Sequence, residues 1–353
     1  MKTAIIGSGI TGAVLAREIQ DSIVFEKDLD IGGRTSTNEF SERERFDPFS
    51  TFFSDKISYS GTNNSKEEFS LLSYLAKNEI DVECILSTFS SNHYYPKNGM
   101  KEMIKKILSK NQIFLSHKLL DISRNPQTNQ WVCSFQNGKE LGFDRVILTP
   151  PLPKSLACLK SSKCMSEWED FISPFVEYKA STILVGIWKG LSNETNRKLA
   201  DLHESTFFRK NEDAEYISIE SSKFKESEDS LIVMIQFGQS FSSRNLERWV
   251  TSNNSPTRFA KITGESFFQK FFISKGFSEL KDQPPLELFA FKKRYAAPDR
   301  SLWKKEDLHL SSELFLKYIE LGRKHGIWLA GDWVFGARIS RCALGATTLA
   351  SQL

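Results

Sequence analysis

A strand, a glycine-rich turn, a helix and a second strand follow one another at the start of the sequence. Residues 4–6 and 23–25 are short apolar runs, and residues 11–19 carry apolar side chains at helical spacing. Two buried strands joined by a helix predict a β-α-β unit, which belongs to a parallel sheet covered by helices. The turn after the first strand reads Gly7-Ser8-Gly9-Ile10-Thr11-Gly12, which has the glycine spacing of a dinucleotide-binding loop.

Each glycine of this loop has a physical role in such a site. Gly7 permits the sharp turn, Gly9 lets a pyrophosphate approach the backbone, and Gly12 lets the helix pack closely on the strands. The phosphates would then lie at the helix N-terminus, where free N–H groups favour negative charge. Glu26, after the second strand, can accept hydrogen bonds from both ribose hydroxyls, and its charge disfavours the 2′-phosphate of NADP.

The segment after Glu26 separates FAD from NAD. Glu26 is followed, after five residues, by Gly32-Gly33-Arg34-Thr35-Ser36, which matches the second flavoprotein box E-x5-G-G-R-x-[ST]. Arg34 offers a guanidinium fork to the pyrophosphate, and a plain NAD-binding fold requires no such box. We therefore predict FAD as the cofactor, bound noncovalently because no Cys or His lies in an obvious flavin-linking motif.

A second candidate contact lies near the other end of the sequence. Asp332 follows the apolar run 327–330 after one glycine, Gly331, and precedes a helix of small residues that begins near Ser340. Its carboxylate suits the ribityl hydroxyls and the pyrimidine edge of a flavin, while the helix N-terminus suits negative charge on the reduced ring. The alternative is that Asp332 only caps a turn.

The remaining pattern predicts a second domain. Residues 65–78 and 99–108 are expected to be helical, and residues 113–115, 119–122, 131–135 and 146–148 are expected to be strands. The prolines between residues 150 and 153 should end regular structure. Residues 182–188, 216–219, 231–236 and 286–292 predict a largely antiparallel sheet with a helix over residues 259–271. The apolar run 327–330 suggests a return to the first sheet.

Composition excludes several other classes of protein. The net charge of +3 is mild and no run of five basic residues occurs, so we expect no nucleic-acid partner. No 18-residue apolar run and no signal-peptide pattern is seen, so we expect no membrane partner and a cytoplasmic location. The five cysteines form no C-x-x-C pair, which predicts reduced thiols and no zinc site. The oligomeric state stays open. The five histidines are scattered: His93, His117, His203, His309 and His325.

With these motifs, the sequence resembles the renalase-like branch of the FAD-dependent amine-oxidase superfamily along nearly its whole length. The matching segments are 5–12, 32–34, 46–52, 96–100, 143–153, 292–298 and 329–332. The resemblance implies an α/β, p-hydroxybenzoate-hydroxylase-like architecture: a Rossmann-type FAD-binding domain and an α+β substrate domain on a largely antiparallel sheet. We assign residues 1–75, 96–153 and 300–353 to the discontinuous FAD-binding domain, and residues 76–95 and 154–299 to the substrate domain.

The motifs and the resemblance together give a set of residues expected to contact FAD. They are Gly7, Gly9, Ile10, Thr11, Gly12, Glu26, Lys27, Gly33, Arg34, Phe49, Ser50, Thr51, Leu119, Asp332 and Ile339.

Three departures from the family pattern fall where the substrate is expected. Phe49 replaces a usual Gly, Lys293 replaces a usual Trp, and Trp333 makes the flavin loop bulkier. Lys293 either binds a substrate phosphate or holds a water near flavin N5, or it is an edge-strand lysine that points to solvent. Tyr295 and Trp333 are either pocket walls or ordinary core residues.

The resemblance implies an FAD-dependent oxidase. Renalase-type enzymes take a hydride from an isomeric dihydronicotinamide, NAD(P)H, onto flavin N5, and oxygen then accepts the electrons and gives hydrogen peroxide. Such a transfer needs no strong base, and no catalytic triad or metal motif is visible. The alternatives are a flavin amine oxidase or desaturase-like enzyme, and an FAD-binding module that has lost catalysis.

Overall fold

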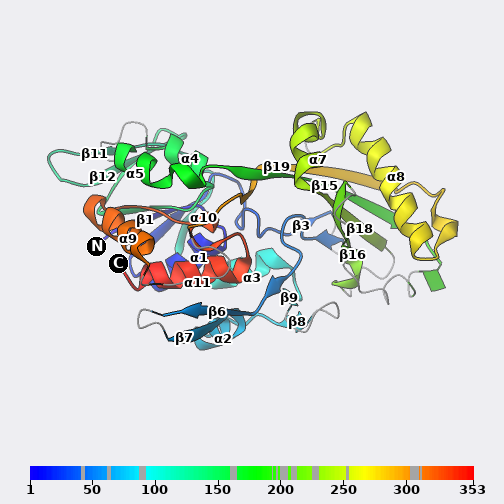
Figure 1. Ribbon diagram of the computed structural model, residues 1–353, viewed down its shortest axis with the longest axis horizontal. Helices are drawn as coiled ribbons and strands as arrows, with labels where there is room; N and C mark the ends of the chain where they lie inside the picture. The colour runs from blue at the N-terminus through cyan, green and yellow to red at the C-terminus, as the bar shows by residue number, and fades with distance from the viewer. Residues whose placement is uncertain are drawn as a thin grey trace.

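The structure is a computed structural model of residues 1–353. It describes the chain except for residues 41–43, 62–64, 87–92, 160–164, 193, 196–197, 199–205, 208–212, 225–229, 252–253, 303–309 and 311. Cys164, His203 and His309 lie outside the described residues. Figure 1 shows two lobes, one holding both termini and the other built around α8, with the long strands β15 and β19 running between them.

A five-stranded parallel sheet forms the centre of the first lobe. Its order is β10-β2-β1-β14-β20, and every neighbouring pair is parallel. Its strands are β1 (Thr3–Ile6), β2 (Ser22–Phe25), β10 (Gln112–Phe114), β14 (Arg145–Leu148) and β20 (Ile327–Leu329). These strands are short and apolar and carry helices on the sheet faces, as the sequence predicted. The late strand β20 joins the sheet beside β14, so the predicted return of the chain is confirmed.

Helices and a small antiparallel sheet surround the parallel sheet. α1 (Ile10–Glu18) contacts α11 (Ile339–Ala350), and both lie beneath the sheet in the view of Figure 1. The antiparallel sheet consists of β11 (Leu119–Arg124), β12 (Trp131–Phe135) and β13 (Glu140–Phe143). The other helices here are α3 (Met100–Ile107), α4 (Leu152–Ala157), α5 (Met165–Ile172), η1 (Ser173–Phe175), α9 (Glu313–His325) and α10 (Asp332–Phe335).

The second lobe is an antiparallel sheet with helices on one face. Its order is β16-β17-β18-β15-β19, and all of its pairs are antiparallel. The strands are β15 (Tyr178–Lys189), β16 (Thr206–Phe207), β17 (Ala214–Ile219), β18 (Ser230–Phe237) and β19 (Glu287–Pro298). The helices are η2 (Glu220–Ser222), α7 (Gln239–Asn245), η3 (Leu246–Arg248), α8 (Arg258–Ser274) and η4 (Ser278–Leu280).

The two faces of this sheet carry different clusters. Leu184 and Trp188 of β15 pack with the phenylalanines of α8 in one apolar cluster. Ile183 of β15 and Phe291 of β19 belong to another, together with Phe46 from the first part of the chain. Because side chains alternate along a strand, odd-numbered residues at this part of β15 face the second cluster. The face that meets the FAD-binding segments is therefore apolar and rich in phenylalanine.

The prediction of one helix over residues 65–78 was wrong in its first half. Residues Lys66–Ser70 form β7, which pairs with β6 (Lys56–Ser60), and α2 (Leu71–Lys77) begins only afterwards. The Ser70 side chain accepts a hydrogen bond from the Ser73 amide, and the Asp55 carboxylate accepts one from the Leu72 amide. These acceptors satisfy the first free N–H groups of α2 and so fix its start at residue 71.

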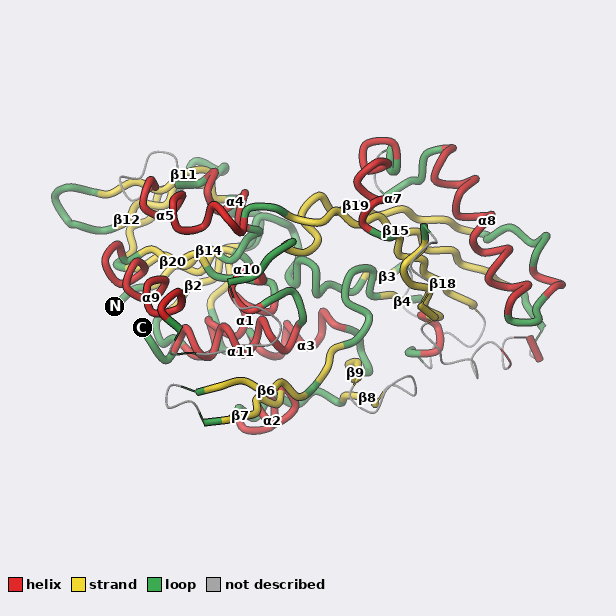
Figure 2. Tube along the Cα trace, in the orientation of Figure 1, coloured by secondary structure: helices red, strands yellow, loops and turns green. Residues whose placement is uncertain are grey.

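The remaining strands form small sheets around the same edge. β5 (Phe53–Ser54), β9 (His93–Pro96) and β8 (Cys84–Leu86) make one, in which β9 pairs with both β5 and β8, so β8 and β9 do not join the second sheet. β3 (Asn38–Glu39) and β4 (Arg45–Phe46) make another. Figure 2 shows β6, β7, α2, β8 and β9 along one side of the molecule.

The prolines between residues 150 and 153 interrupt regular structure for a shorter stretch than the sequence predicted. Helix α4 begins at Leu152, and Pro153 lies in its first turn, where proline is tolerated.

Within the described residues, no helix is long and apolar enough to cross a membrane. The same residues contain no group of three or more His, Cys, Asp or Glu arranged to hold a metal ion. The four cysteines that the structure describes are free thiols: Cys84, Cys133, Cys158 and Cys342.

Candidate cofactor site

The glycine loop joins β1 to α1, and two of its glycines are required by the fold itself. Gly7 has a φ of +103°, which L side chains rarely adopt. A Cβ on Gly12 would lie 1.9 Å from the Gly7 carbonyl oxygen, so only glycine lets α1 approach the strand this closely. Gly9 differs, because a Cβ there would meet only the Gly32 carbonyl oxygen, at 3.7 Å. No protein atom therefore requires glycine at position 9, and the space beside its backbone is open to a ligand.

The N-terminus of α1 has free hydrogen-bond donors beside that opening. Gly9 is the N-cap residue and supplies no side-chain acceptor, so no cap side chain occupies the first N–H groups of the helix. Ile10 and Thr11 begin the helix and are buried. Uncapped N–H groups and the helix dipole together form a site for a pyrophosphate.

Glu26 connects the glycine loop with the second flavoprotein box. Its Oε2 atom accepts hydrogen bonds from the Ser8 amide at 2.9 Å and from Ser8 Oγ at 2.7 Å. Its Oε1 atom accepts one from the Asp28 amide at 3.1 Å. A carboxylate has about four lone-pair sites, so Glu26 keeps acceptor capacity for a ribose hydroxyl. Lys27 next to it is exposed, and its ammonium contacts Asp28.

The second box lies directly against the first. The Gly32 amide donates to the Ser8 carbonyl oxygen at 3.2 Å, and a Cβ on Gly33 would come within 4.0 Å of the Gly9 Cα atom. Gly33 has a φ of +59°, in the left-handed region that favours glycine. The glycine loop around Gly9 and the pair Gly32-Gly33 are separated in the sequence by a helix and a strand. Their backbones therefore form one continuous surface.

Arg34 and Asp332 meet in an ion pair, although 298 positions separate them in the sequence. Arg34 Nη1 also donates to the Ala296 carbonyl oxygen at 2.6 Å, and Asp332 Oδ1 accepts from the Tyr178 hydroxyl at 2.9 Å. Burial lowers the pKa of Arg34, whereas the neighbouring Asp332 carboxylate raises it, and the net shift of the Arg34 pKa is upward. The structure thus brings the second box, the C-terminal flavin loop and both inter-lobe strands to one place. Tyr178 was not predicted from the sequence, where a tyrosine before a strand has no distinguishing signal.

A second helix N-terminus lies in the same region. α11 begins at Ile339, which is buried, and its N-cap residue Arg338 supplies no side-chain acceptor. The α11 residue Cys342 and the α1 residue Thr11 are close enough to hydrogen-bond through their side chains. The two uncapped N-termini therefore belong to helices that contact each other. Leu119, the remaining backbone candidate, is the buried first residue of β11.

The segment Phe49–Thr51 is half-buried and is held by a buried charged cluster that sequence analysis missed. Asp47 Oδ1 accepts from Thr37 Oγ1 at 2.6 Å, and the Asp47 amide donates to Glu220 Oε2 at 3.1 Å. Lys223 Nζ lies 2.7 Å from the same Glu220 oxygen. Burial raises the pKa of Asp47 to about 6, although Lys223 opposes this shift. Nothing in the sequence marks Glu220 and Lys223, because a single acid–base pair three residues apart is common on any surface.

The three pocket candidates have different surroundings. Trp333 is fully buried, with its ring 5.7 Å from that of Tyr318 and 5.8 Å from that of Phe175, so it fills the core and does not line a pocket. Tyr295 is half-buried, with its ring 5.9 Å from that of Tyr178. Lys293 lies on the edge strand β19, but its ammonium is 5.1 Å from the Phe49 ring centroid and is not directed to solvent.

The residues present fit FAD. An open backbone at Gly9, two uncapped helix N-termini, a carboxylate with spare acceptor capacity at Glu26 and a guanidinium at Arg34 match the phosphates, ribose and flavin of a dinucleotide. Glu26 and Asp332 are buried, and Arg34 and Asp332 contact each other.

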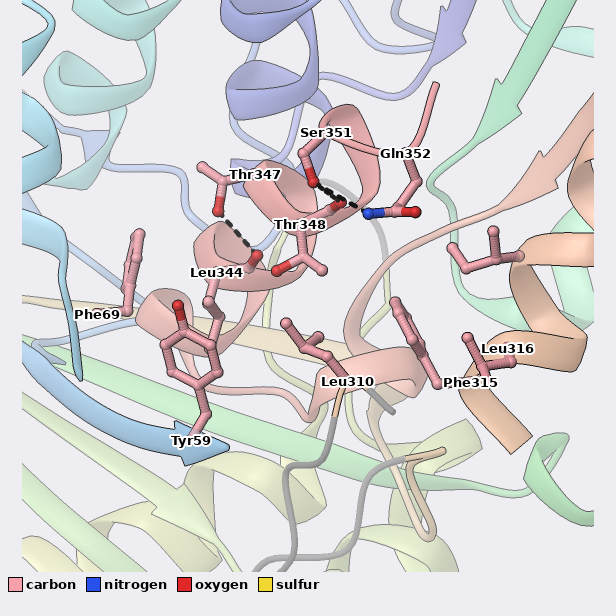
Figure 3. A pocket seen from close by; sticks show the side chains of 11 residues that line it. Tyr59, Phe69, Leu310, Phe315, Leu316, Leu344, Thr347, Thr348, Ser351 and Gln352 are labelled. Atoms are coloured by element: carbon pink, nitrogen blue, oxygen red, sulfur yellow. Dashed lines mark hydrogen bonds between the residues drawn. The ribbon is translucent and has the colours of Figure 1, made fainter. Parts of the chain in front are cut away.

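A separate cavity of about 330 Å³ lies between the β6–β7 hairpin, α9 and α11 (Figure 3). Its polar groups already have partners: the Tyr59 hydroxyl donates to Glu67, Thr347 Oγ1 to the Leu344 carbonyl oxygen, and Ser351 Oγ to the Thr348 carbonyl oxygen. This cavity therefore offers few free polar groups to a ligand and does not include any predicted cofactor residue.

Comparison with known proteins supports an FAD-dependent oxidoreductase. Residues 26–170 match the model of the family described as flavin containing amine oxidoreductase. This match confirms the sequence prediction of an FAD-dependent oxidoreductase. No curated protein matches the chain.

Solved structures share the fold over almost the whole chain. One is a protein from Exiguobacterium sp. 255-15 assigned as a protoporphyrinogen oxidase, with 13% identity, a TM-score of 0.64, and coverage of 99% of this chain and 98% of that one. Another is a reduced UDP-galactopyranose mutase, with 11% identity, a TM-score of 0.60, and 99% and 94% coverage. A third is a putrescine oxidase bound to putrescine, with 9% identity, a TM-score of 0.56, and 99% and 98% coverage. At these identities the likeness shows the fold alone, and it confirms the predicted mixed α/β fold class.

Proposed function

We propose that this chain is an FAD-dependent oxidase of the renalase type, which takes a hydride from an isomeric dihydronicotinamide dinucleotide and passes the electrons to oxygen. The observation that carries the proposal is the meeting of Arg34 and Asp332 beside the glycine loop. It supports a single dinucleotide site made from both ends of the sequence. The proposal keeps the division into an FAD-binding domain of residues 1–75, 96–153 and 300–353 and a substrate domain of residues 76–95 and 154–299.

The chain's own residues would hold the cofactor by its charged and polar parts. The N-terminus of α1 and the open backbone at Gly9 would bind the pyrophosphate, and Glu26 would accept from the ribose. Asp332 would accept from ribityl hydroxyls, while the N-terminus of α11 would favour negative charge at the flavin. Bound FAD supplies the hydride acceptor, at its N5 atom.

The second sheet would supply the substrate side of the site. Phe46, Phe49 and Phe291 form an apolar surface on the face that meets the cofactor segments, and such a surface excludes water from the reacting atoms. A dihydronicotinamide gives up its hydride without prior loss of a proton, so the residues need only position the ring. None of the pocket candidates Lys293, Tyr295 and Trp333 is a carboxylate or histidine that would serve as a general base. This apolar surface therefore favours a dihydronicotinamide over an amine as the substrate.

An anaerobic reduction experiment tests the proposal. The FAD-loaded protein is mixed with α-NADH, with 1,2- and 1,6-dihydronicotinamide isomers, with ordinary NADH and with a panel of amines, and the flavin absorbance is followed. We expect rapid bleaching by an isomeric dihydronicotinamide, followed on aeration by recovery of colour and formation of hydrogen peroxide. Bleaching by amines alone would contradict the proposal in favour of amine oxidation. An absence of bleaching by the whole panel would indicate an FAD-binding module without this activity.

A further inference from the structure

Ser181 and Lys293 lie opposite each other on the sheet face that meets the cofactor segments. β15 and β19 are antiparallel, with Ser181 paired to Lys293 and Ile183 paired to Phe291. Residues directly opposite in an antiparallel pair project to the same face, and so do residues two apart along a strand. Ile183 and Phe291 belong to the apolar cluster against which Phe49 packs. Ser181 and Lys293 therefore extend that apolar surface with two polar groups.

The Ser181 hydroxyl is buried and has no partner. The residue is 5% exposed, and its Oγ atom makes no hydrogen bond to any described residue. A buried hydroxyl left unsatisfied costs about 1–3 kcal/mol, so it is seldom kept without a reason. Its neighbour Thr182, on the other face of the sheet, differs because its Oγ1 lies 3.0 Å from Ser242 Oγ. Of these two neighbouring hydroxyls, the one that lacks a partner is therefore on the face that meets the cofactor segments.

Lys293 is a half-buried cation for which the described part of the chain supplies no ion pair. Its neighbours on the strand, Lys292 and Arg294, project to the opposite face and both contact Glu247. The Lys293 ammonium lies over the Phe49 ring. Burial is the main factor that lowers its pKa, and Lys27 lowers the pKa further, whereas Asp28 raises it with a smaller effect. A buried charge is costly unless it is paired, so this position favours an anionic ligand group.

We propose that Lys293 and Ser181 form a subsite for a carboxylate or phosphate group of the substrate, whose apolar body packs on Phe49 and Phe291. The inference rests on the proposed function and assigns a binding position to an anionic group of its substrate. The Lys293 ammonium and the Ser181 hydroxyl can each donate a hydrogen bond to an oxygen of a carboxylate or phosphate. A cationic amine would be repelled by Lys293. The adjoining rings suit a planar body.

Lys293 and the Arg34 contact occupy different positions on β19. Ala296, whose carbonyl oxygen accepts from Arg34, is three residues farther along β19 than Lys293, and the register with β15 shifts between these two positions. Arg34 is near enough to Lys293 to lower its pKa. The experiment must therefore distinguish an anion of the substrate from a phosphate of the cofactor.

A titration of the FAD-loaded protein with benzoate tests this subsite. Benzoate is planar and anionic, and benzamide and benzylamine are its neutral and cationic counterparts. We expect benzoate to perturb the flavin absorbance with saturation, and benzamide and benzylamine to bind at least 10-fold more weakly. Lys293→Met should weaken benzoate binding at least 10-fold and Ser181→Ala several-fold, whereas Lys293→Arg should keep most of it. Lys292→Met, the matched control on the opposite face, should bind benzoate as the unmodified protein does.

The possible outcomes separate the inference from its rivals. Equal binding of benzoate by Lys293→Met and by the unmodified protein would overturn it, as would equal binding of benzamide or no binding of benzoate. Loss of FAD from Lys293→Met, with benzoate binding intact after FAD is restored, would show that Lys293 contacts the cofactor instead. Ser181→Ala should be at least as stable to urea as the unmodified protein, so weaker binding by this variant cannot come from unfolding. If the proposed function alone fails, no dihydronicotinamide will bleach the flavin, but benzoate binding will persist and depend on Lys293.

Discussion

Replacing Gly9 by alanine should separate folding from cofactor binding. The backbone at Gly9 has φ −69° and ψ 179°, which alanine adopts without strain. The new Cβ would be 3.7 Å from the nearest protein atom, an ordinary contact distance. Alanine restricts the unfolded chain, which stabilises by about 0.4–1 kcal/mol, but it is a poorer N-cap residue than glycine by a similar amount, so the stability of the apoprotein should change little.

The same methyl group should weaken FAD binding strongly. It would occupy the space through which a pyrophosphate reaches the N–H groups of α1. Hydrogen bonds to charged groups contribute about 1.5–3 kcal/mol each, so loss of one or two would cost about 3 kcal/mol. At 1.4 kcal/mol for each factor of ten, the dissociation constant for FAD should rise about 100-fold.

Two further variants make the experiment decisive. Gly238 is the N-cap of α7 with nearly the same backbone angles, and its Cβ would be 3.5 Å from the nearest atom, so Gly238→Ala should change neither stability nor FAD binding. Gly12→Ala should impair both, because its Cβ would lie 1.9 Å from the Gly7 carbonyl oxygen. Stability is measured by urea unfolding of the apoproteins, and affinity by quenching of FAD fluorescence. Full FAD affinity in Gly9→Ala would refute the assignment of this backbone to the pyrophosphate.

Other substitutions test the surroundings of the site. Asp332→Asn should destabilise the apoprotein to urea by about 3 kcal/mol, because it removes the charge partner of the largely buried Arg34; an unchanged midpoint would contradict this. Gly345→Ala should cost about 1–3 kcal/mol, since its Cβ would come within 2.2 Å of the Phe335 ring, and a Tm equal to that of the unmodified protein would argue against this packing. Burial raises the pKa of Asp47 to about 6, so the folded protein holds this proton more tightly, and the unmodified protein should lose stability relative to Asp47→Asn as pH rises from about 4 to about 6. Parallel curves of unfolding free energy against pH for these two proteins would contradict that sign.

The geometry of the candidate cofactor site was largely predictable because its residues lie in two short sequence boxes with strict spacing. Glycine at positions 7 and 12 could be predicted because the helix and the strand must approach closely there. The role of Arg34 could be predicted from its spacing after Glu26. The long strands of the second sheet were also found, since apolar β-branched runs such as 182–188 are distinctive. The hairpin at 66–70 was not, because Lys66-Glu67-Glu68 has no apolar period and its strand is fixed by pairing with β6.

The substrate side could not be derived in the same way. Its residues come from strands and loops far apart in the sequence, and their meeting depends on register. The pairing of Ser181 with Lys293, and that of Asp47 with Glu220, follow from how β15, β19 and β17 are placed, which local composition does not determine. Trp333 shows a related case: the sequence left open whether this large residue is a pocket wall or a core residue, and the structure places it in the core between Phe175 and Tyr318.

The most direct test of the account is the identity and amount of cofactor carried by the protein. The purified protein, reconstituted with excess FAD and freed of unbound ligand, is precipitated with acid, and the supernatant is separated by chromatography. We predict FAD in an amount close to that of the protein, all of it in the supernatant because no covalent bond holds it. Release of a nicotinamide dinucleotide in its place, or no retained flavin, would contradict the central claim that Gly7–Gly12, Glu26 and Arg34 form an FAD site.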